Sequence, residues 1–341
     1  MTEPPSTGLP PEDRAPDTED TPPTSGPAAG LTTFALEGRR APALFVVGWI
    51  GAFAGVALIA MTMLGATGLG ALVLSVAGFG ALSMGTILLA GSQTIERKAA
   101  GASYAGPSPL LVFVAVIATG RLAGYLVGIP LLQVADAIPP ALGDLLATVI
   151  LAVVFLGVLR LTVVGPGALD WTSMGLRGDV GRAVRELLGG ATYAIPVILV
   201  TAVVAALAVQ LAGVTPPSPL PATGTPDGLL LHLLAGAVLA PFYEEILFRG
   251  FALRVWWTTH GTRTAIVRSS LLFVAAHVLF VGGDSFQEAL SLAFVGGVVR
   301  LPVAFVLGWL YVRTGSLWAP IGLHAAFNAV LITIGEIAVP Q

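Results

Sequence analysis

Residues 229–253 read LLLHLLAGAVLAPFYEEILFRGFAL, an apolar run that contains two carboxylates and a guanidinium. About 20 apolar residues are enough to cross a bilayer as an α-helix. Charged side chains are costly inside a membrane, and where they occur they commonly mark a functional site. The segment therefore predicts a membrane helix on which Glu244, Glu245 and Arg249 have a specific task.

The rest of the chain also has the composition of a membrane protein. Of its 341 residues, 55% are hydrophobic and 10% are charged, whereas soluble domains contain about 25% charged residues. Apolar runs recur along most of the sequence, which predicts an all-α, polytopic bundle of transmembrane helices. The chain has no cysteine, which excludes disulfides and thiolate ligands or nucleophiles. The membrane is the expected partner; no feature indicates a nucleic acid or an oligomeric state.

About nine spans are expected in this bundle. They cover residues 43–64, 69–91, 108–133, 141–162, 187–213, 228–254, 265–281, 288–313 and 316–337. Residues 1–36 are rich in proline, small polar and acidic residues, which predicts a disordered cytoplasmic tail. We divide the remainder into a four-span N-terminal extension with an interfacial segment, residues 37–186, and a catalytic membrane core, residues 187–341.

Lysine and arginine cluster in every second loop. These loops carry Arg39, Arg40, Arg97, Lys98, Arg160, Arg177, Arg182, Arg185, Arg254, Arg263, Arg268 and Arg313. The intervening loops hold Asp136, the proline-rich stretch 215–227 and residues 282–284, with no lysine or arginine. Because cytoplasmic loops are enriched in these residues, the N-terminus is predicted in the cytoplasm and the C-terminus outside. Residues 172–190 are predicted to lie at the membrane interface.

The adjacent carboxylates of residues 244 and 245 point in different directions. Residues four apart share a helix face, so Glu245 can form an ion pair with Arg249 that supports the helix. Glu244 points about 100° away, because an α-helix has 3.6 residues per turn. Pro241 removes a backbone hydrogen bond and is expected to kink the helix just before the carboxylates.

Two later spans also carry polar groups at helical spacing, Phe273 with His277 and His324 with Asn328. We expect Glu244 to face His277, His324 and Asn328 across a small polar cavity. A carboxylate can deprotonate a bound water, and neutral donors can stabilise an oxyanion on a peptide carbonyl. Glu244, His277 and His324 could instead bind a divalent metal such as zinc. Each residue alone is more commonly structural, so their occurrence on neighbouring spans is what indicates a site.

The depth of these residues predicts the side from which the site opens. Glu244 is about ten residues from the basic end of its span, roughly 15 Å at the rise of an α-helix. His324 is about eight residues from the cytoplasmic end of the last span, roughly 12 Å by the same measure. The site is therefore expected in the cytoplasmic half of the membrane.

The polar residues form three regularly spaced motifs. Residues 244–249 read EEILFR, residues 273–277 read FVAAH and residues 324–328 read HAAFN, the last preceded by TGSLWAP at 314–320. In order and spacing they resemble the CPBP family of intramembrane proteases, which includes CAAX prenyl endopeptidases and bacteriocin-processing or immunity proteins, also called the Abi family. The likeness covers about residues 190–337, and the first four spans look like a variable extension.

The resemblance implies a membrane endopeptidase. The roles it implies are water activation by Glu244, assistance by His277, oxyanion stabilisation by His324 with Asn328, and support by Glu245, Arg249 and Phe273. Prenyl-protease members cleave after a lipidated cysteine near the C-terminus of the substrate, so a membrane-associated or lipidated peptide or protein is the expected substrate. No cofactor is expected to be required, and a divalent metal stays an alternative.

Two functions of other classes use the same buried charges. One is an ion or solute transporter, although the sequence shows no internal repeat. The other is a non-catalytic immunity or scaffold protein that binds a peptide. Other intramembrane proteases fit less well, because the chain lacks a His-Glu-x-x-His zinc motif and a Gly-x-Ser-Gly nucleophile. Asp136 and Asp144 also do not form an intramembrane pair.

Overall fold

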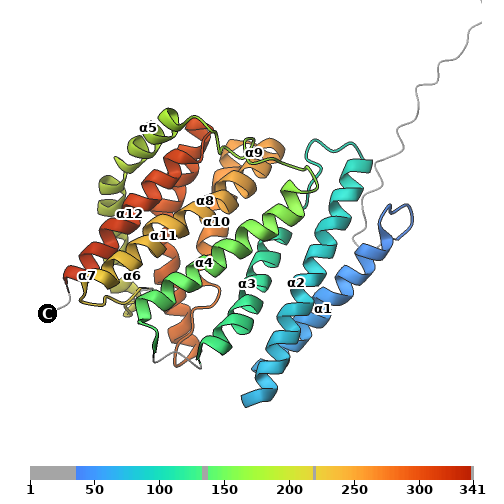
Figure 1. Ribbon diagram of the computed structural model, residues 1–341, viewed down its shortest axis with the longest axis horizontal. Coiled ribbons are helices and arrows are strands. Elements are labelled where there is room, and N and C mark those ends of the chain that lie inside the picture. Colours follow the sequence, from blue (N-terminus) through green and yellow to red (C-terminus); the bar gives the residue numbers. More distant parts are fainter. Residues whose placement is uncertain (1–35, 133–136, 218–219, 339–341) are drawn as a thin grey trace, which may run out of the picture. The chain divides into compact units, whose positions relative to one another are not determined.

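The computed structural model describes residues 36–132, 137–217 and 220–338. Within these ranges the chain is helical and has no strand, which confirms the all-α prediction. Of the predicted tail, residues 1–36, only the last residue lies within the described ranges, and Asp136 and the end of the third predicted span lie outside them. The chain from Arg40 onward forms one compact unit (Figure 1).

The helices of this unit follow the predicted spans. The first four are α1 (Pro42–Met63), α2 (Gly68–Ala99), α3 (Pro109–Leu132) and α4 (Pro140–Leu159), the last continued by the π-helical segment η2 (Arg160–Val164). They are followed by α5 (Val180–Ala191), α6 (Ala194–Ala212), α10 (Thr262–Val278), α11 (Phe286–Thr314) and α12 (Trp318–Ile337), with a composite helix between α6 and α10.

Among the described residues, eight helical segments are long and apolar enough to cross a membrane. The helix α10, with 17 residues, is slightly shorter than these. Together they agree with the prediction of about nine spans, so the chain is an integral, multi-pass membrane protein. Apolar side chains such as Val47, Ile50 and Phe53 of α1 are more than half exposed. A lipid environment would cover such side chains.

The composite helix carries both carboxylates and runs without a break from Pro226 to His260. Its parts are α7 (Pro226–Leu233), η3 (Leu234–Leu239), α8 (Ala240–Glu245), η4 (Ile246–Leu253) and α9 (Arg254–His260), with η3 and η4 π-helical. Thr225 caps its start, because the Thr225 side chain accepts a hydrogen bond from the backbone N–H of Gly228. The kink predicted at Pro241 stays a prediction; the proline lies in the first turn of α8, directly after the π-helical segment η3.

The fifth span begins later than the predicted residue 187. Residues 180–191 form the separate helix α5, and the chain turns at Thr192 and Tyr193 before α6 begins at Ala194. Pro196 explains the new start, because proline lacks an N–H and is tolerated in the first turn of a helix. Helix α5 corresponds to part of the interfacial segment predicted at residues 172–190.

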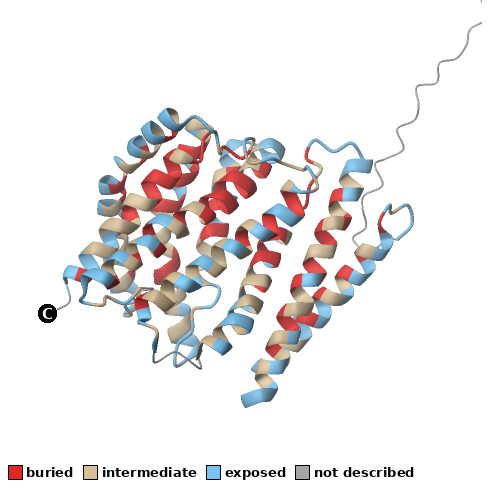
Figure 2. Cartoon of the chain, viewed as in Figure 1, coloured by how far each residue is buried: buried red, intermediate tan, exposed pale blue. Residues whose placement is uncertain are grey.

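The first four spans are tied to the core by aromatic contacts. The ring of Phe113 in α3 lies 6.4 Å from that of Phe248 in η4, and the ring of Phe155 in α4 lies 4.7 Å from that of Tyr243 in α8. Buried residues gather around α8 and α10 at the centre of the unit (Figure 2). The division of the chain at residue 186 remains a prediction, and α3 and α4 contribute to the surroundings of the carboxylates.

The contact between α5 and α12 gives a test of the packing. A Cβ atom on Gly190 would overlap the backbone carbonyl of Ala319, whereas one on Gly189 would meet nothing within 4 Å. We therefore expect Gly190→Ala to destabilise the protein by about 1–3 kcal/mol, the usual cost of overpacking. The neighbouring Gly189→Ala should be neutral or slightly stabilising, because alanine is the better helix former. Thermal unfolding in detergent compares the two, and equal stability would contradict this packing.

Candidate active site

An ion pair lies at the centre of the composite helix, as the spacing predicted. The Nη1 atom of Arg249 is 2.9 Å from Oε1 of Glu245, and neither side chain is exposed. The Nη2 atom of Arg249 also donates to the backbone carbonyl of Ala304 in α11, at 3.1 Å. A buried charge pair is tolerated only with such additional hydrogen bonds. The pair therefore fixes α8 and η4 to α11 as well as bracing its own helix.

His324 connects the two carboxylates. Its Nδ1 atom is 2.9 Å from Oε1 of Glu245, and its Nε2 atom is 3.9 Å from Oε2 of Glu244. The sequence did not reveal the bond between Glu245 and His324, because helical spacing reports faces within a helix and not partners on another. Glu245 consequently orients the histidine ring, as the aspartate does in a Ser-His-Asp triad.

His277 approaches the same carboxylate from α10. Its Nε2 atom is 3.9 Å from Oε2 of Glu244, and its Nδ1 atom is 2.8 Å from the backbone carbonyl of Phe273. A carbonyl can only accept, so in the neutral ring the proton of His277 lies on Nδ1. The same reasoning applies to His324, whose Nδ1 faces a carboxylate. Both neutral rings therefore present an unprotonated Nε2 to Glu244.

Three hydrogen-bond acceptors thus converge, and Oε2 of Glu244 is buried without a hydrogen-bond partner among the described residues. Acceptors in this arrangement are satisfied by a shared proton or by a group that donates to them, such as a water molecule. A separation of 3.9 Å between Oε2 and each nitrogen leaves room for one water within hydrogen-bond reach of both. The geometry is suited to hold and polarise water.

Phe273 packs between the charged and the aromatic groups of the site. The guanidinium carbon of Arg249 lies 4.6 Å from its ring centroid, a cation–π distance. The ring is 4.5 Å from that of His277 and 5.7 Å from that of His324. One apolar side chain therefore positions both histidines and shields the ion pair, which gives the FVAAH motif a physical reason.

Asn328 lines a cavity together with Glu244, His277 and His324, and its side-chain amide contacts the backbone. Its Nδ2 atom donates to the carbonyl of Gly236 in η3, at 2.7 Å. In a π-helical turn that carbonyl would bond the N–H of the residue five positions later, which is Pro241 and has none. Asn328 therefore satisfies a backbone acceptor that the proline leaves free, and retains a second amide hydrogen for another partner.

The fit to a metal ion depends on how closely the donors approach one another. Histidines that bind metals hold Nδ1 in a second hydrogen bond and present Nε2, as His277 and His324 do here. Among the described residues, however, no group of three histidine, aspartate or glutamate side chains is arranged to hold a metal. Glu244, His277 and His324 would have to draw closer together to do so.

Two cavities meet at Glu244 and His277. The first has a volume of about 690 Å³ and is also lined by Phe273, His324 and Asn328. The second, of about 730 Å³, lies among α3, α4, α8 and α10. Both are mainly apolar, with one arginine each, Arg300 in the first and Arg121 in the second. The carboxylate therefore lies at the boundary of two chambers that could hold parts of one extended ligand.

These features define a class: an integral membrane helix bundle with a carboxylate and two histidines, from three helices, beside two cavities. Residues 226–330 match the family model described as Type II CAAX prenyl endopeptidase Rce1-like. This match confirms, over those residues, the resemblance to the CPBP family of intramembrane proteases that the three motifs predicted.

A curated relative supplies a further comparison. A protein of Escherichia coli, described as an uncharacterized 24.3 kDa protein, is 33% identical over 115 residues, which are 32% of this chain and 46% of that protein. The chain thus spans less than half the length of the curated relative it matches. No solved structure matches the chain.

Proposed function

We propose that the chain is an intramembrane endopeptidase, which hydrolyses a peptide bond of a membrane-associated or lipidated peptide or protein with a water activated by Glu244. The observation that carries this proposal is that Nε2 of His277 and Nε2 of His324 each lie 3.9 Å from the same oxygen of Glu244. The match to an endopeptidase family over residues 226–330 supports it.

The proposed reaction begins with a water held between Glu244 and His277. Glu244 takes one proton of the water, and the water oxygen attacks the peptide carbonyl at the same time. This attack gives a tetrahedral oxyanion. Asn328 stabilises the oxyanion with its second amide hydrogen, and His324 does so from Nε2 when its ring is protonated. Glu244 then returns the proton to the leaving amine, so that two products form and the carboxylate is regenerated. Glu245, Arg249 and Phe273 act as positioning residues.

We also propose the orientation that the charged loops favour, with the N-terminus in the cytoplasm and the C-terminus outside. The loops rich in arginine and lysine precede α1, join α2 to α3, α4 to α6, and α9 to α10, and end with Arg313 before α12. All of them fall on one side under this arrangement. The proposal needs no cofactor, and a divalent metal at Glu244, His277 and His324 is its alternative form.

A transporter is the main competing function, because Glu244 and His277 line two cavities at once and could pass an ion between them. Transport predicts solute or proton uptake by proteoliposomes without peptide cleavage. If the chain is instead an immunity or scaffold protein, peptide should bind without being cleaved and without solute or proton uptake.

Purified protein in detergent or lipid discs tests the proposal with a library of membrane-associated and lipidated peptides, followed by mass spectrometry. We expect cleavage of at least one peptide class, abolished in His277→Ala and unaffected by EDTA or phenanthroline. Loss of cleavage with either chelator, restored by zinc, would favour the metal alternative. Solute uptake with no cleavage of any peptide would contradict proteolysis.

A further inference from the structure

The site is sealed on the side of the arginine-rich loops. All eight residues of η4, which follow the carboxylates toward that side, are buried. The segment before α5 and the turn between α11 and α12 close over η4, since the Tyr311 hydroxyl donates to the carbonyl of Met174 at 2.9 Å. The N–H of Leu317 donates to the carbonyl of Gly175 at 3.1 Å. Two turns of tightly packed helix therefore separate Glu244 from this face.

The first cavity extends from Glu244 in the opposite direction. Its wall follows α12 from His324 to Glu336, near the C-terminal end of that helix. Its far end is lined by Leu220 and Ala222 of the loop before α7, and by Gly335, an exposed residue in the last turn of α12. The cavity thus runs from the carboxylate toward the end of the bundle where α7 begins and α12 ends.

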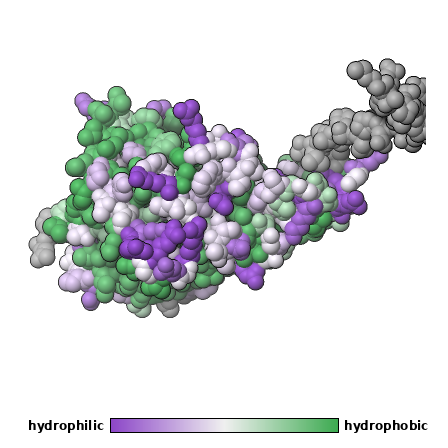
Figure 3. Space-filling view, turned by 90° about the horizontal axis from the view of Figure 1, so that it is seen from above, coloured by the Kyte–Doolittle hydropathy of each residue, from purple (hydrophilic) through white to green (hydrophobic). Residues whose placement is uncertain are grey.

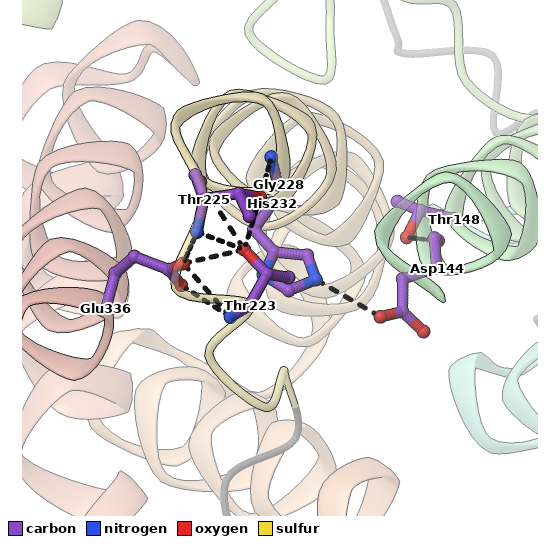
Figure 4. A network of polar contacts seen from close by, with 7 residues as sticks. All are labelled: Asp144, Thr148, Thr223, Thr225, Gly228, His232 and Glu336. Atoms are coloured by element: carbon purple, nitrogen blue, oxygen red, sulfur yellow. Dashed lines mark hydrogen bonds and ion pairs between the residues drawn. The ribbon is translucent and has the colours of Figure 1, made fainter. Parts of the chain in front are cut away.

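The far end of the cavity has a defined edge, shown in Figure 4. Oε1 of Glu336 accepts hydrogen bonds from the Thr223 backbone N–H at 3.0 Å, the Thr223 hydroxyl at 2.6 Å and the Thr225 backbone N–H at 3.2 Å. On the other side, Nε2 of His232 lies 3.2 Å from Oδ2 of Asp144 in α4. These contacts hold the loop before α7 to α12 and join α7 to α4, so the rim is a built part of the structure.

The second cavity extends in both directions from Glu244, because Val116, Phe155 and Phe248 line it on the side of the arginine-rich loops. At its other end it is lined by Gly128, Leu131 and Gly143, which lie near the end of α3 and the beginning of α4. It also includes Phe280, just beyond the end of α10. These helix ends adjoin the two loops that have no lysine or arginine among their described residues. Neither cavity includes a residue of α5 or α9.

Figure 3 shows the face of the molecule that lies on the closed side of the site. Hydrophilic side chains gather on this face, toward which α5 and α9 lie in Figure 1. The arginines that begin or follow α9, among them Arg254 and Arg263, belong to this end of the bundle. Because arginine-rich loops remain in the cytoplasm, this closed face is the cytoplasmic one in the proposed orientation.

We infer that peptide substrate reaches Glu244 from the non-cytoplasmic side. The substrate class is therefore a polypeptide whose cleaved bond lies outside the cytoplasm or in the outer half of the membrane. This inference rests on the proposed function and orientation, and it replaces the cytoplasmic opening expected from depth alone. Glu244 is 18 residues from Pro226 (244 − 226) and 16 from His260 (260 − 244), so depth along the composite helix favours neither side.

The absence of cysteine makes the test direct, because a single introduced thiol reports its own accessibility. Gly335→Cys places a thiol at the cavity rim, where a Cβ atom would meet nothing within 4 Å, and the control Thr258→Cys places one at an exposed position of α9. A membrane-impermeant maleimide should label Gly335→Cys in intact cells and fail to label Thr258→Cys. In inverted membrane vesicles only Thr258→Cys should react.

The reverse pattern would overturn the inference, and so would protection of Gly335→Cys in both preparations. Labelling does not depend on catalysis, so it decides the side of access even if no peptide is ever cleaved. Where cleavage is measured, a bulky maleimide on Gly335→Cys should abolish it, and the same reagent on Thr258→Cys should leave it unchanged. Full cleavage by the blocked Gly335→Cys protein would show that substrate enters elsewhere.

Discussion

Glu244→Gln is expected to lower peptide cleavage by about 10²–10⁴-fold, the usual contribution of a positioned general base. The amide has the shape of the carboxylate but does not take the proton of water. Thermal stability should hardly change, because Oε2 of Glu244 has no hydrogen-bond partner among the described residues that the substitution would remove. Initial rates and melting temperature, measured on the same preparation, check both expectations.

The matched control for this variant is Glu288→Gln. Glu288 is a partly exposed carboxylate in the first turn of α11 that lines neither cavity; its Oε2 accepts a hydrogen bond from the backbone N–H of Asp284, which an amide oxygen can also accept. Its replacement removes the same charge from the same protein, so cleavage should continue at the wild-type rate. Equal rates for wild type and Glu244→Gln would exclude Glu244 as the base.

Arg249→Met is expected to destabilise the protein by about 3–5 kcal/mol, the cost of removing one partner from a buried ion pair. Glu245 would keep its bond from His324 but lose the guanidinium at 2.9 Å. The loss should therefore be seen in thermal unfolding as well as in activity.

The double variant Glu245→Gln with Arg249→Met separates charge from packing. It removes both charges together, so much of the stability should return. An amide at position 245 can still accept from Nδ1 of His324, which keeps that ring in place. If Arg249→Met alone were as stable as the wild type, the ion pair would not be buried as described.

Much of this architecture could be predicted from the sequence, because the underlying rules are local. Apolar runs of sufficient length predict membrane helices, and i to i+4 spacing placed Glu245 beside Arg249. Successive residues of an α-helix are rotated by about 100°, which correctly predicted that Glu244 does not join the ion pair of Glu245 and Arg249. The three motifs predicted that their residues would meet, and Glu244, His277 and His324 do converge.

Other features depend on contacts between helices, and the spacing of residues within one helix does not predict such contacts. Nothing in the spacing of α12 indicated that His324 would bond Glu245, or that Asn328 would satisfy the carbonyl left free by Pro241. The direction of the first cavity could not be predicted from the sequence either. It follows from which side of Glu244 is filled by large side chains, and every residue from Ile246 to Leu253 is buried.

Cleavage in H₂¹⁸O tests the central claim most directly, namely that Glu244 activates a water that hydrolyses a peptide bond. A cleaved membrane peptide would be analysed by mass spectrometry, with wild type and Glu244→Gln in parallel. We predict that the wild-type protein adds one ¹⁸O to the new C-terminal carboxylate and that Glu244→Gln yields no labelled product above background. A product without ¹⁸O, or equal labelled product from both proteins, would contradict the account.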